Sequence, residues 1–175
     1  SKELKSLGFT EEQLLVGGLV IKTTIDQKAQ TAAVDAINKL TPKGAPENLH
    51  TALVAIRPGT GEIVAMYGGA DYLKRQLNDA TQAIALAGST FKPFVYATAI
   101  DRLQKSPCDM IMDSPFTILK GDNNDKDWTP NNSDGKYRGL VSMKKALANS
   151  INTVSARLIH EVGAPAVVEM AKNLG

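Results

Sequence analysis

The fold is decided by the stretch AGSTFKPFVY, residues 87–96, in which Ser89 lies three positions before Lys92 and Pro93 follows directly. A proline fits the first turn of a helix, where amide groups have no intrahelical partner, and disrupts a helix interior. If residues 94–103 (FVYATAIDRL) are helical, that helix must therefore begin near Ser89. Ser89 and Lys92 then lie one turn apart on the same face, with Ser89 at the positive end of the helix dipole.

This placement suits a nucleophile and its base. Apolar neighbours would remove water from Lys92 and lower its pKa toward that of a neutral amine that accepts a proton. A serine beside such a lysine is typical of a Ser-Lys catalytic pair. In a competing interpretation, Ser89 only caps a core helix and Lys92 extends to solvent. The tetrad alone does not separate the two.

The sequence holds two further Ser-x-x-Lys tetrads, although composition predicts only about one by chance. Ser133 and Lys136 lie in the turn-forming run NNSDGKY, where no fixed catalytic geometry is expected. Ser142 precedes MKKAL and is placed to be a helix N-cap, with its oxygen bound to backbone amides. Context therefore favours Ser89 over Ser133 and Ser142.

Composition sets outer bounds on function. The 175 residues are 43% hydrophobic and 22% charged, as expected for one globular domain. A net charge of +2, spread along the chain, gives no reason to expect a nucleic-acid partner. Cys108 is the single cysteine, so no internal disulfide forms, and neither His50 nor His160 has a second ligand at metal spacing. We therefore expect no metal and no cofactor.

The N-terminal part of the sequence predicts a short strand over residues 17–26 and a helix from Asp26 to about Leu40. Residues 51–58 and 62–69 predict a β-hairpin joined around Gly59, Thr60 and Gly61. The inward face of the helix would carry Ala29, Ala33, Ile37 and Leu40.

In the C-terminal part, residues 106–139 contain three prolines and a long polar run. They are expected to be irregular, and loops of this length are usually functional or mobile. Three helices are predicted after them: one from about Met143, one over Thr153–Val162, and one opened by Pro165 and closed by Gly175.

A second motif, Ser150-Ile151-Asn152, follows Ser89 by 61 residues and lies between two predicted helices. Ser-x-x-Lys followed by Ser-x-Asn resembles the serine acyl-transferases that recognise penicillin. More widely, the chain resembles the transpeptidase domain of bifunctional, class A penicillin-binding proteins. Leu86 and Ala87 depart from that pattern, in which a polar residue and a proline are expected. The resemblance rests on GGLVIKTTIDQKAQ (17–30), ALVAIRPGTGEIVAMYGG (52–69), GSTFKPFVYATAI (88–100), DWTPNN (127–132) and ALANSINTVSARL (146–158).

The resemblance implies a mixed α+β fold of the penicillin-recognising serine transpeptidase and β-lactamase type, an antiparallel sheet flanked by helices. Here that fold would be incomplete, with the first hairpin and the helical region. Residues 1–24 would be an interdomain linker and the opening strand, and residues 25–175 the N-terminal part of the transpeptidase domain.

The resemblance also implies an activity, D,D-transpeptidation of peptidoglycan through a serine acyl-enzyme, without cofactor or metal. Ser89 would attack the bond between the two terminal D-alanines of a stem peptide, and Lys92 would take its proton. Ser150 would relay a proton to the leaving D-alanine, and Asn152 would hold the donor by hydrogen bonding. A β-lactam would acylate Ser89 and inhibit the enzyme.

The third family motif, Lys-Thr-Gly, does not occur in the sequence, and Lys22-Thr23-Thr24 precedes the nucleophile instead of following it. In the family that motif supplies a second oxyanion-hole amide, whose loss typically lowers the rate by about 100- to 1,000-fold. We therefore expect this chain to be inactive alone and to partner a C-terminal fragment of the same protein. The expected location is the extracytoplasmic face of the bacterial membrane, with the anchor outside this chain.

Three other functions stay open on the residues. A class A β-lactamase has similar motif spacing but would turn penicillin over rapidly. A β-lactam-sensing domain would be acylated once, without passing its acyl group to an amine. A wall-binding module without catalytic activity would bind the wall equally well after the substitution Ser89→Ala.

Overall fold

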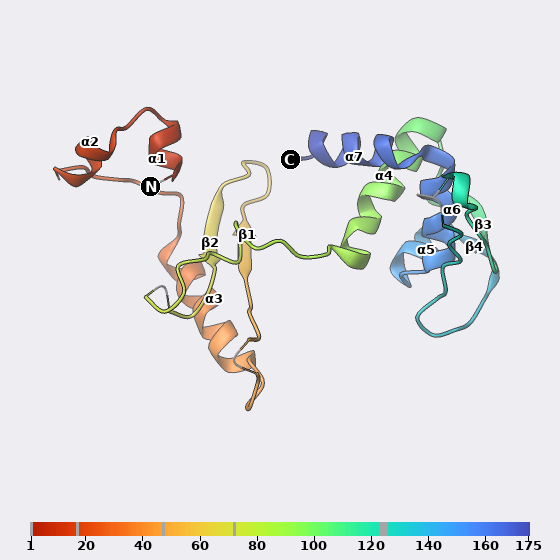
Figure 1. Cartoon of the computed structure of the whole chain (residues 1–175), viewed down its shortest axis with the longest axis horizontal. Helices are drawn as coiled ribbons and strands as arrows, with labels where there is room; N and C mark the ends of the chain where they lie inside the picture. The colour runs from red at the N-terminus through yellow and green to blue at the C-terminus, as the bar shows by residue number, and fades with distance from the viewer. Residues whose placement is uncertain (1, 17, 47, 72, 123–125) are drawn as a thin grey trace. The chain divides into compact units, whose positions relative to one another are not determined.

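Two units make up the chain, residues 1–85 and residues 86–175. The computed structural model describes residues 2–16, 18–46, 48–71, 73–122 and 126–175. Both units combine helices with a two-stranded antiparallel sheet (Figure 1). The predicted mixed α+β class is therefore confirmed.

The first unit contains two short helices followed by a longer helix and a hairpin. Thr10 and Gln13 form a capping box at the start of the second helix. The carboxylate of Asp26 caps the third helix by accepting from the amide of Ala29 at 2.8 Å, as predicted from the sequence. The elements are α1 (Lys2–Ser6), α2 (Glu11–Leu15), α3 (Gln27–Leu40), β1 (Leu53–Ile56) and β2 (Ile63–Tyr67).

The hairpin forms where the sequence predicts it. Leu53 pairs with Tyr67, and the register shifts between Ala55 and Ile56. Its turn needs left-handed backbone at Gly59 and Gly61, with φ of 87° and 76°, which glycine adopts without steric cost.

Side chains and one backbone amide close the edge of β2 that faces away from β1. Gln30 of α3 donates to the carbonyl of Met66 and accepts from its amide, both at 2.8 Å. The hydroxyl of Thr24 donates to the carbonyl of Ile63 at 2.7 Å. The side-chain amide of Gln30 thus takes the place that a neighbouring strand would fill.

The strand predicted over residues 17–26 is wrong within the described residues 18–26, which form no strand; residue 17 lies outside them. In this segment Asp26 alone contributes a backbone bond to β2, from its amide to the carbonyl of Val64 at 2.9 Å. One bond does not make a ladder, and the other contacts of this segment with β2 come from side chains.

Most of the predicted inner face of α3 is also found. Ala33 is buried, and Ala29 and Ile37 are half-buried. Leu40, expected on that face, is 80% exposed. It is the last residue of the helix.

The second unit carries a sheet that the sequence did not suggest. Residues 106–139, expected to be irregular, contain all of β3, which pairs antiparallel with β4 from Met110↔Ser142 to Asp113↔Gly139. The elements are a 3-10 turn η1 (Gly88–Phe91), α4 (Lys92–Leu103), β3 (Met110–Asp113), η2 (Lys120–Asp122), β4 (Gly139–Ser142), α5 (Met143–Ala148), α6 (Asn152–Val162) and α7 (Ala164–Asn173).

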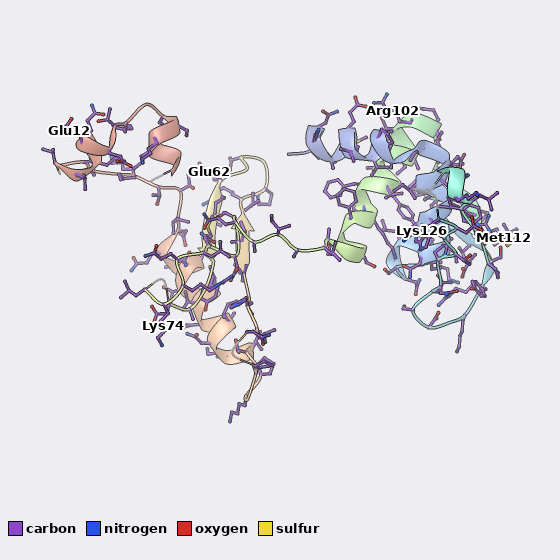
Figure 2. The ribbon with its side chains drawn as sticks, in the orientation of Figure 1. Glu12, Glu62, Lys74, Arg102, Met112 and Lys126 are labelled. Carbon is purple, nitrogen blue, oxygen red and sulfur yellow. The ribbon has the colours of Figure 1, made fainter. Side chains whose placement is uncertain are left out.

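A hydrophobic core lies between the helices of this unit. The helix α4 packs against α6 and α7 (Figure 1), and Arg102 of α4, labelled in Figure 2, donates to Glu169 of α7 at 3.1 Å. The three predicted helices after residue 142 are present within two residues of their expected ends. The core consists of Val95, Tyr96, Ala99, Val141, Met143, Ala146, Ile151, Val154, Leu158 and Val167.

Candidate active site

Ser89 and Lys92 lie on successive turns at the start of α4. Ser89 is within η1, which leads directly into α4 at Lys92, and Pro93 occupies the first turn of α4. The proline therefore sits where it displaces no intrahelical bond. Ser89 is exposed, whereas Lys92 is only 9% exposed.

The amine of Lys92 is surrounded by oxygens from the second motif. Its Nζ donates to the carbonyl of Ser150 at 2.7 Å, to the hydroxyl of Ser150 at 2.9 Å and to Oδ1 of Asn152 at 2.6 Å. Burial lowers the pKa of Lys92, because removal from water disfavours the charged amine. The lysine therefore does not extend to solvent, contrary to the competing interpretation of the tetrad.

The hydroxyl of Ser150 links the other two groups. It accepts from Lys92 and lies 2.9 Å from Oγ of Ser89, to which it donates. Among the described residues, Lys92 reaches Ser89 through Ser150 and not by a direct hydrogen bond. A continuous line of hydrogen bonds thus runs from Ser89 to the buried amine.

Backbone geometry explains how Ser150 makes two contacts at once. Its φ is 53°, in the left-handed region that residues other than glycine seldom adopt. With this conformation both the carbonyl and the hydroxyl of Ser150 face Lys92. Ile151, buried at 1% exposure, follows it and leads into α6.

Asn152 is the first residue of α6, one position earlier than the sequence predicted. Its Oδ1 accepts from Lys92, and its Nδ2 donates to the carbonyl of Asn131 at 2.7 Å. The amide group is thus held on both sides, by the base and by the loop that contains DWTPNN.

A cavity of about 470 Å³ opens beside these residues. The loop from Trp128 to Asn131 forms one wall, and residues of η1, α4 and α6 form the others. It is lined by Gly88, Phe91, Lys92, Val95, Trp128, Thr129, Pro130, Asn131, Asn152, Ser155, Ala156 and Ile159. Apolar walls with a few converging polar groups are typical of small-molecule sites.

The other two Ser-x-x-Lys tetrads have the structural roles that their context predicted. Ser142 is the N-cap of α5, and its hydroxyl accepts from the amide of Lys145 at 3.3 Å. Ser133 lies in a turn. Neither serine forms a hydrogen bond with the side chain of its lysine among the described contacts.

Two buried polar residues near the site, Asp113 and Asn132, were not singled out from the sequence. Asn132 accepts from the amides of Asn152 and Thr153 at 2.9 and 3.3 Å. Asp113 accepts from Asn132 and Thr153 at 2.7 and 2.6 Å. The one available signal was the run NN in DWTPNN, which does not reveal which asparagine is buried.

The site combines an exposed hydroxyl, a desolvated amine and a hydroxyl between them. This arrangement can activate a serine for attack on a carbonyl and return the proton to a leaving group. In the part of the chain that the structure describes, no three histidine, cysteine, aspartate or glutamate residues are grouped to hold a metal ion. No helix in that part is long and apolar enough to cross a membrane.

Comparison with known proteins agrees with the arrangement of the motifs. The family described as penicillin binding protein transpeptidase domain matches residues 51–175. Penicillin-binding protein 1A of Neisseria flavescens is 41% identical over 115 residues, which are 66% of this chain and 14% of that protein. Penicillin-binding protein 1A of Aquifex aeolicus is 38% identical over 130 residues, which are 73% and 17% of the two chains. The chain therefore spans less than a fifth of these relatives.

Solved structures show the same likeness. PonA1 from Mycobacterium tuberculosis in complex with penicillin V matches with a TM-score of 0.80 at 29% identity, over 98% of this chain and 43% of that one. Penicillin-binding protein 1A from Haemophilus influenzae matches with a TM-score of 0.64 at 32% identity, over 70% of this chain and 18% of that one.

Proposed function

Because the chain belongs to the penicillin-binding protein transpeptidase domain family, we propose that it carries the nucleophile and base of a peptidoglycan D,D-transpeptidase. One observation carries the proposal, the line of hydrogen bonds from Ser89 through Ser150 to Lys92. It joins two motifs 61 residues apart in the sequence into one acid-base unit.

Acylation begins at Ser89. Its Oγ attacks the carbonyl carbon between the two terminal D-alanines of a stem peptide, and a new C–O bond forms. The hydroxyl proton passes to Ser150 while the proton of Ser150 passes to neutral Lys92, along the same two contacts with donors and acceptors reversed, because a neutral amine can accept. The lowered pKa of Lys92 increases the fraction of neutral amine that can accept this proton.

Collapse of the tetrahedral intermediate breaks the C–N bond and releases D-alanine. The leaving nitrogen takes a proton from Ser150, which recovers one from protonated Lys92. An amine of a second stem peptide then attacks the ester, loses a proton to the same relay and frees Ser89. The product is an amide cross-link, and no oxidant or cofactor is consumed.

Asn152 and the cavity serve the donor peptide in this proposal. The amide of Asn152 borders the cavity and is fixed by Lys92 and Asn131, so it can offer hydrogen bonds at a set position. A β-lactam mimics the donor, acylates Ser89 and leaves a stable ester.

A Lys-Thr-Gly segment outside these 175 residues completes the site in this proposal. It would supply the second oxyanion-hole amide and the binding of the substrate carboxylate. The protein would work on the extracytoplasmic face of a bacterial membrane, where peptidoglycan lies, and this chain alone would be inactive. Residues 1–24 would then be a linker, and residues 25–175 part of the catalytic domain.

The test is intact-mass spectrometry of the natural full-length protein after incubation with benzylpenicillin. We expect one penicilloyl adduct, absent in Ser89→Ala. The matched control is Ser133→Ala, which alters the same kind of tetrad in a turn and should keep the adduct. An adduct that persists in Ser89→Ala would refute the assignment of the nucleophile.

The same adduct separates the alternatives. A transpeptidase keeps the penicilloyl ester for many minutes. When it is given a thioester analogue of the stem peptide, it also transfers the acyl group of that analogue to a D-amino acid. A β-lactamase loses the adduct within seconds, and a sensor keeps it but transfers nothing. Transfer to D-alanine, followed by mass spectrometry of the product, is therefore the deciding measurement.

A further inference from the structure

The side chain of Asn132 binds the backbone at the end of the turn that contains Ser150 and Asn152. Its Oδ1 accepts from the backbone amides of Asn152 and Thr153, two of the amides at the start of α6 that have no intrahelical partner. The residue in the N-cap position of α6, Ile151, forms no side-chain cap. Asn132, 20 residues earlier in the sequence, therefore performs the cap.

Asp113 fixes the orientation of that asparagine. Its carboxylate is fully buried at 0% exposure and accepts from Nδ2 of Asn132 at 2.7 Å. Because an ionised carboxylate only accepts, the nitrogen of Asn132 must face Asp113 and its oxygen must face α6. The amide and guanidinium of Arg138 donate to the other carboxylate oxygen at 3.0 and 3.3 Å.

We propose that Asp113 and Asn132 are positioning residues that hold the turn from Ser150 to Asn152 against Lys92. The left-handed conformation of Ser150 persists only if its surroundings impose it. Buried Ile151 anchors one side of the turn, and Asn132 anchors the backbone just after it. The inference deepens the proposed function and rests on it, since Ser150 and Asn152 act there.

The first test uses Asn132→Leu in the natural full-length protein, which keeps the branched shape of the side chain. It removes the two hydrogen bonds to the amides of Asn152 and Thr153, and also those that Nδ2 donates to Asp113 and to the carbonyl of Lys136. Hydrogen exchange of the Asn152 and Thr153 amides should become at least about tenfold faster, because their acceptor is gone. The rate constant for acylation of Ser89 by benzylpenicillin should fall about 10- to 100-fold, as expected when reacting groups shift by about 1 Å. Val167→Ala, a buried change in α7, is the control for lost stability and should leave that rate constant unchanged.

Each outcome bears on one claim. Unchanged exchange of Asn152 and Thr153 in Asn132→Leu overturns the positioning role, as does faster exchange with an unchanged acylation rate. A wild-type protein that forms no adduct refutes the proposed function instead. In that case the exchange data still decide whether Asn132 holds the turn.

The second test uses Asn132→Asp, which keeps the shape and the acceptor but sets two carboxylates face to face. Among the described residues, the charged group in contact with Asp113 is Arg138, and it remains in the variant. When the two carboxyl groups share one proton, the protonated one can donate a hydrogen bond as Nδ2 of Asn132 does in the wild type. Repulsion between the two negative charges raises the pKa at which the pair binds this proton. The acylation rate of the variant relative to wild type at the same pH should therefore rise at least about fivefold from pH 8 to pH 5.5. The ratio removes the part of the Lys92 titration that variant and wild type share, and a flat ratio would overturn the proposal.

Discussion

The two units of the chain differ in how their elements are held. In residues 86–175 a cluster of buried side chains from four helices and β4 forms a continuous core. In residues 1–85 the only buried hydrophobic residues among those described are Ala33 and Ala65. There the side chain of Gln30 joins α3 to the hairpin by two hydrogen bonds to Met66.

This difference shows why the candidate site can be preorganised in one unit. Burial of apolar surface contributes about 25 cal/mol per Å², so the second unit has its own driving force for folding. Ser89, Lys92 and Asn152 lie on η1, α4 and α6, and Ser150 lies in the turn between α5 and α6, next to buried Ile151 of that core. Their mutual distances are therefore set within residues 86–175.

The largest expected effect is in the core of the second unit. Leu158, on α6, is 0% exposed, and Leu158→Ala should lower the free energy of unfolding by about 2–5 kcal/mol. Urea denaturation followed by the fluorescence of Trp128, the single tryptophan, measures it. Leu140→Ala, the same change at a residue that is 60% exposed, is the control. Equal losses in both variants would contradict the description of the core.

A smaller effect is expected at Asp113, also in the second unit. Burial raises the pKa of this carboxyl, but hydrogen bonds from Thr153, Asn132 and Arg138 outweigh burial, so the pKa lies below its ordinary value. Asp113→Asn should lower the free energy of unfolding by about 1–3 kcal/mol at pH 7.

The pH dependence of this loss has a definite sign. A lowered folded-state pKa stabilises the protein above the unfolded pKa, about 3.9 for aspartate. That stability disappears as the pH falls through the folded-state pKa. The difference between wild type and Asp113→Asn should therefore be constant above about pH 5 and shrink in acid. A difference that grows in acid would show that the carboxyl is protonated in the folded protein.

The first unit is tested at the edge of β2. Gln30→Ala removes both hydrogen bonds to Met66, which should weaken the local structure by about 1–2 kcal/mol. Hydrogen exchange of the Met66 amide should then be about tenfold faster. Gln27→Ala, at an exposed position of α3, should leave that exchange unchanged. If both variants behaved alike, the side chain of Gln30 would not be what holds this edge.

The smallest effect is expected at Leu40. This side chain is 80% exposed, so Leu40→Ala should change the free energy of unfolding by less than about 0.5 kcal/mol. A thermal melt by circular dichroism is sufficient. A loss above about 1 kcal/mol would show that Leu40 is covered, and the contrast with Leu158 would narrow.

Local signals in the sequence predicted the elements whose ends depend on nearby residues. Pro93 located the start of α4, Asp26 that of α3, and Gly59 with Gly61 the hairpin turn. The four-residue strands β3 and β4 escaped prediction, because each is short and finds its partner only after a long polar loop. Sequence distance hides such pairs.

At the candidate site the sequence predicted the four residues that meet, but not the residues that hold them in place. The position of Pro93 singled out Ser89 and Lys92, and the family resemblance singled out Ser150 and Asn152; the structure brings all four together. Their catalytic roles stay predictions. Burial of Asn132 could not be read from two adjacent asparagines. The positive φ of Ser150 could not be predicted from residue type either, because serine seldom adopts this conformation.

The side-chain amide of Gln30 has a further consequence, for the chain as it is synthesised. Residues 24–67 leave the ribosome before residues 86–175, so the hairpin exists for a time without the later core. A bare strand edge in that interval can pair with another nascent chain and aggregate. With Gln30, Asp26 and Thr24 bound to backbone groups of β2, that edge has fewer free groups with which another chain could pair.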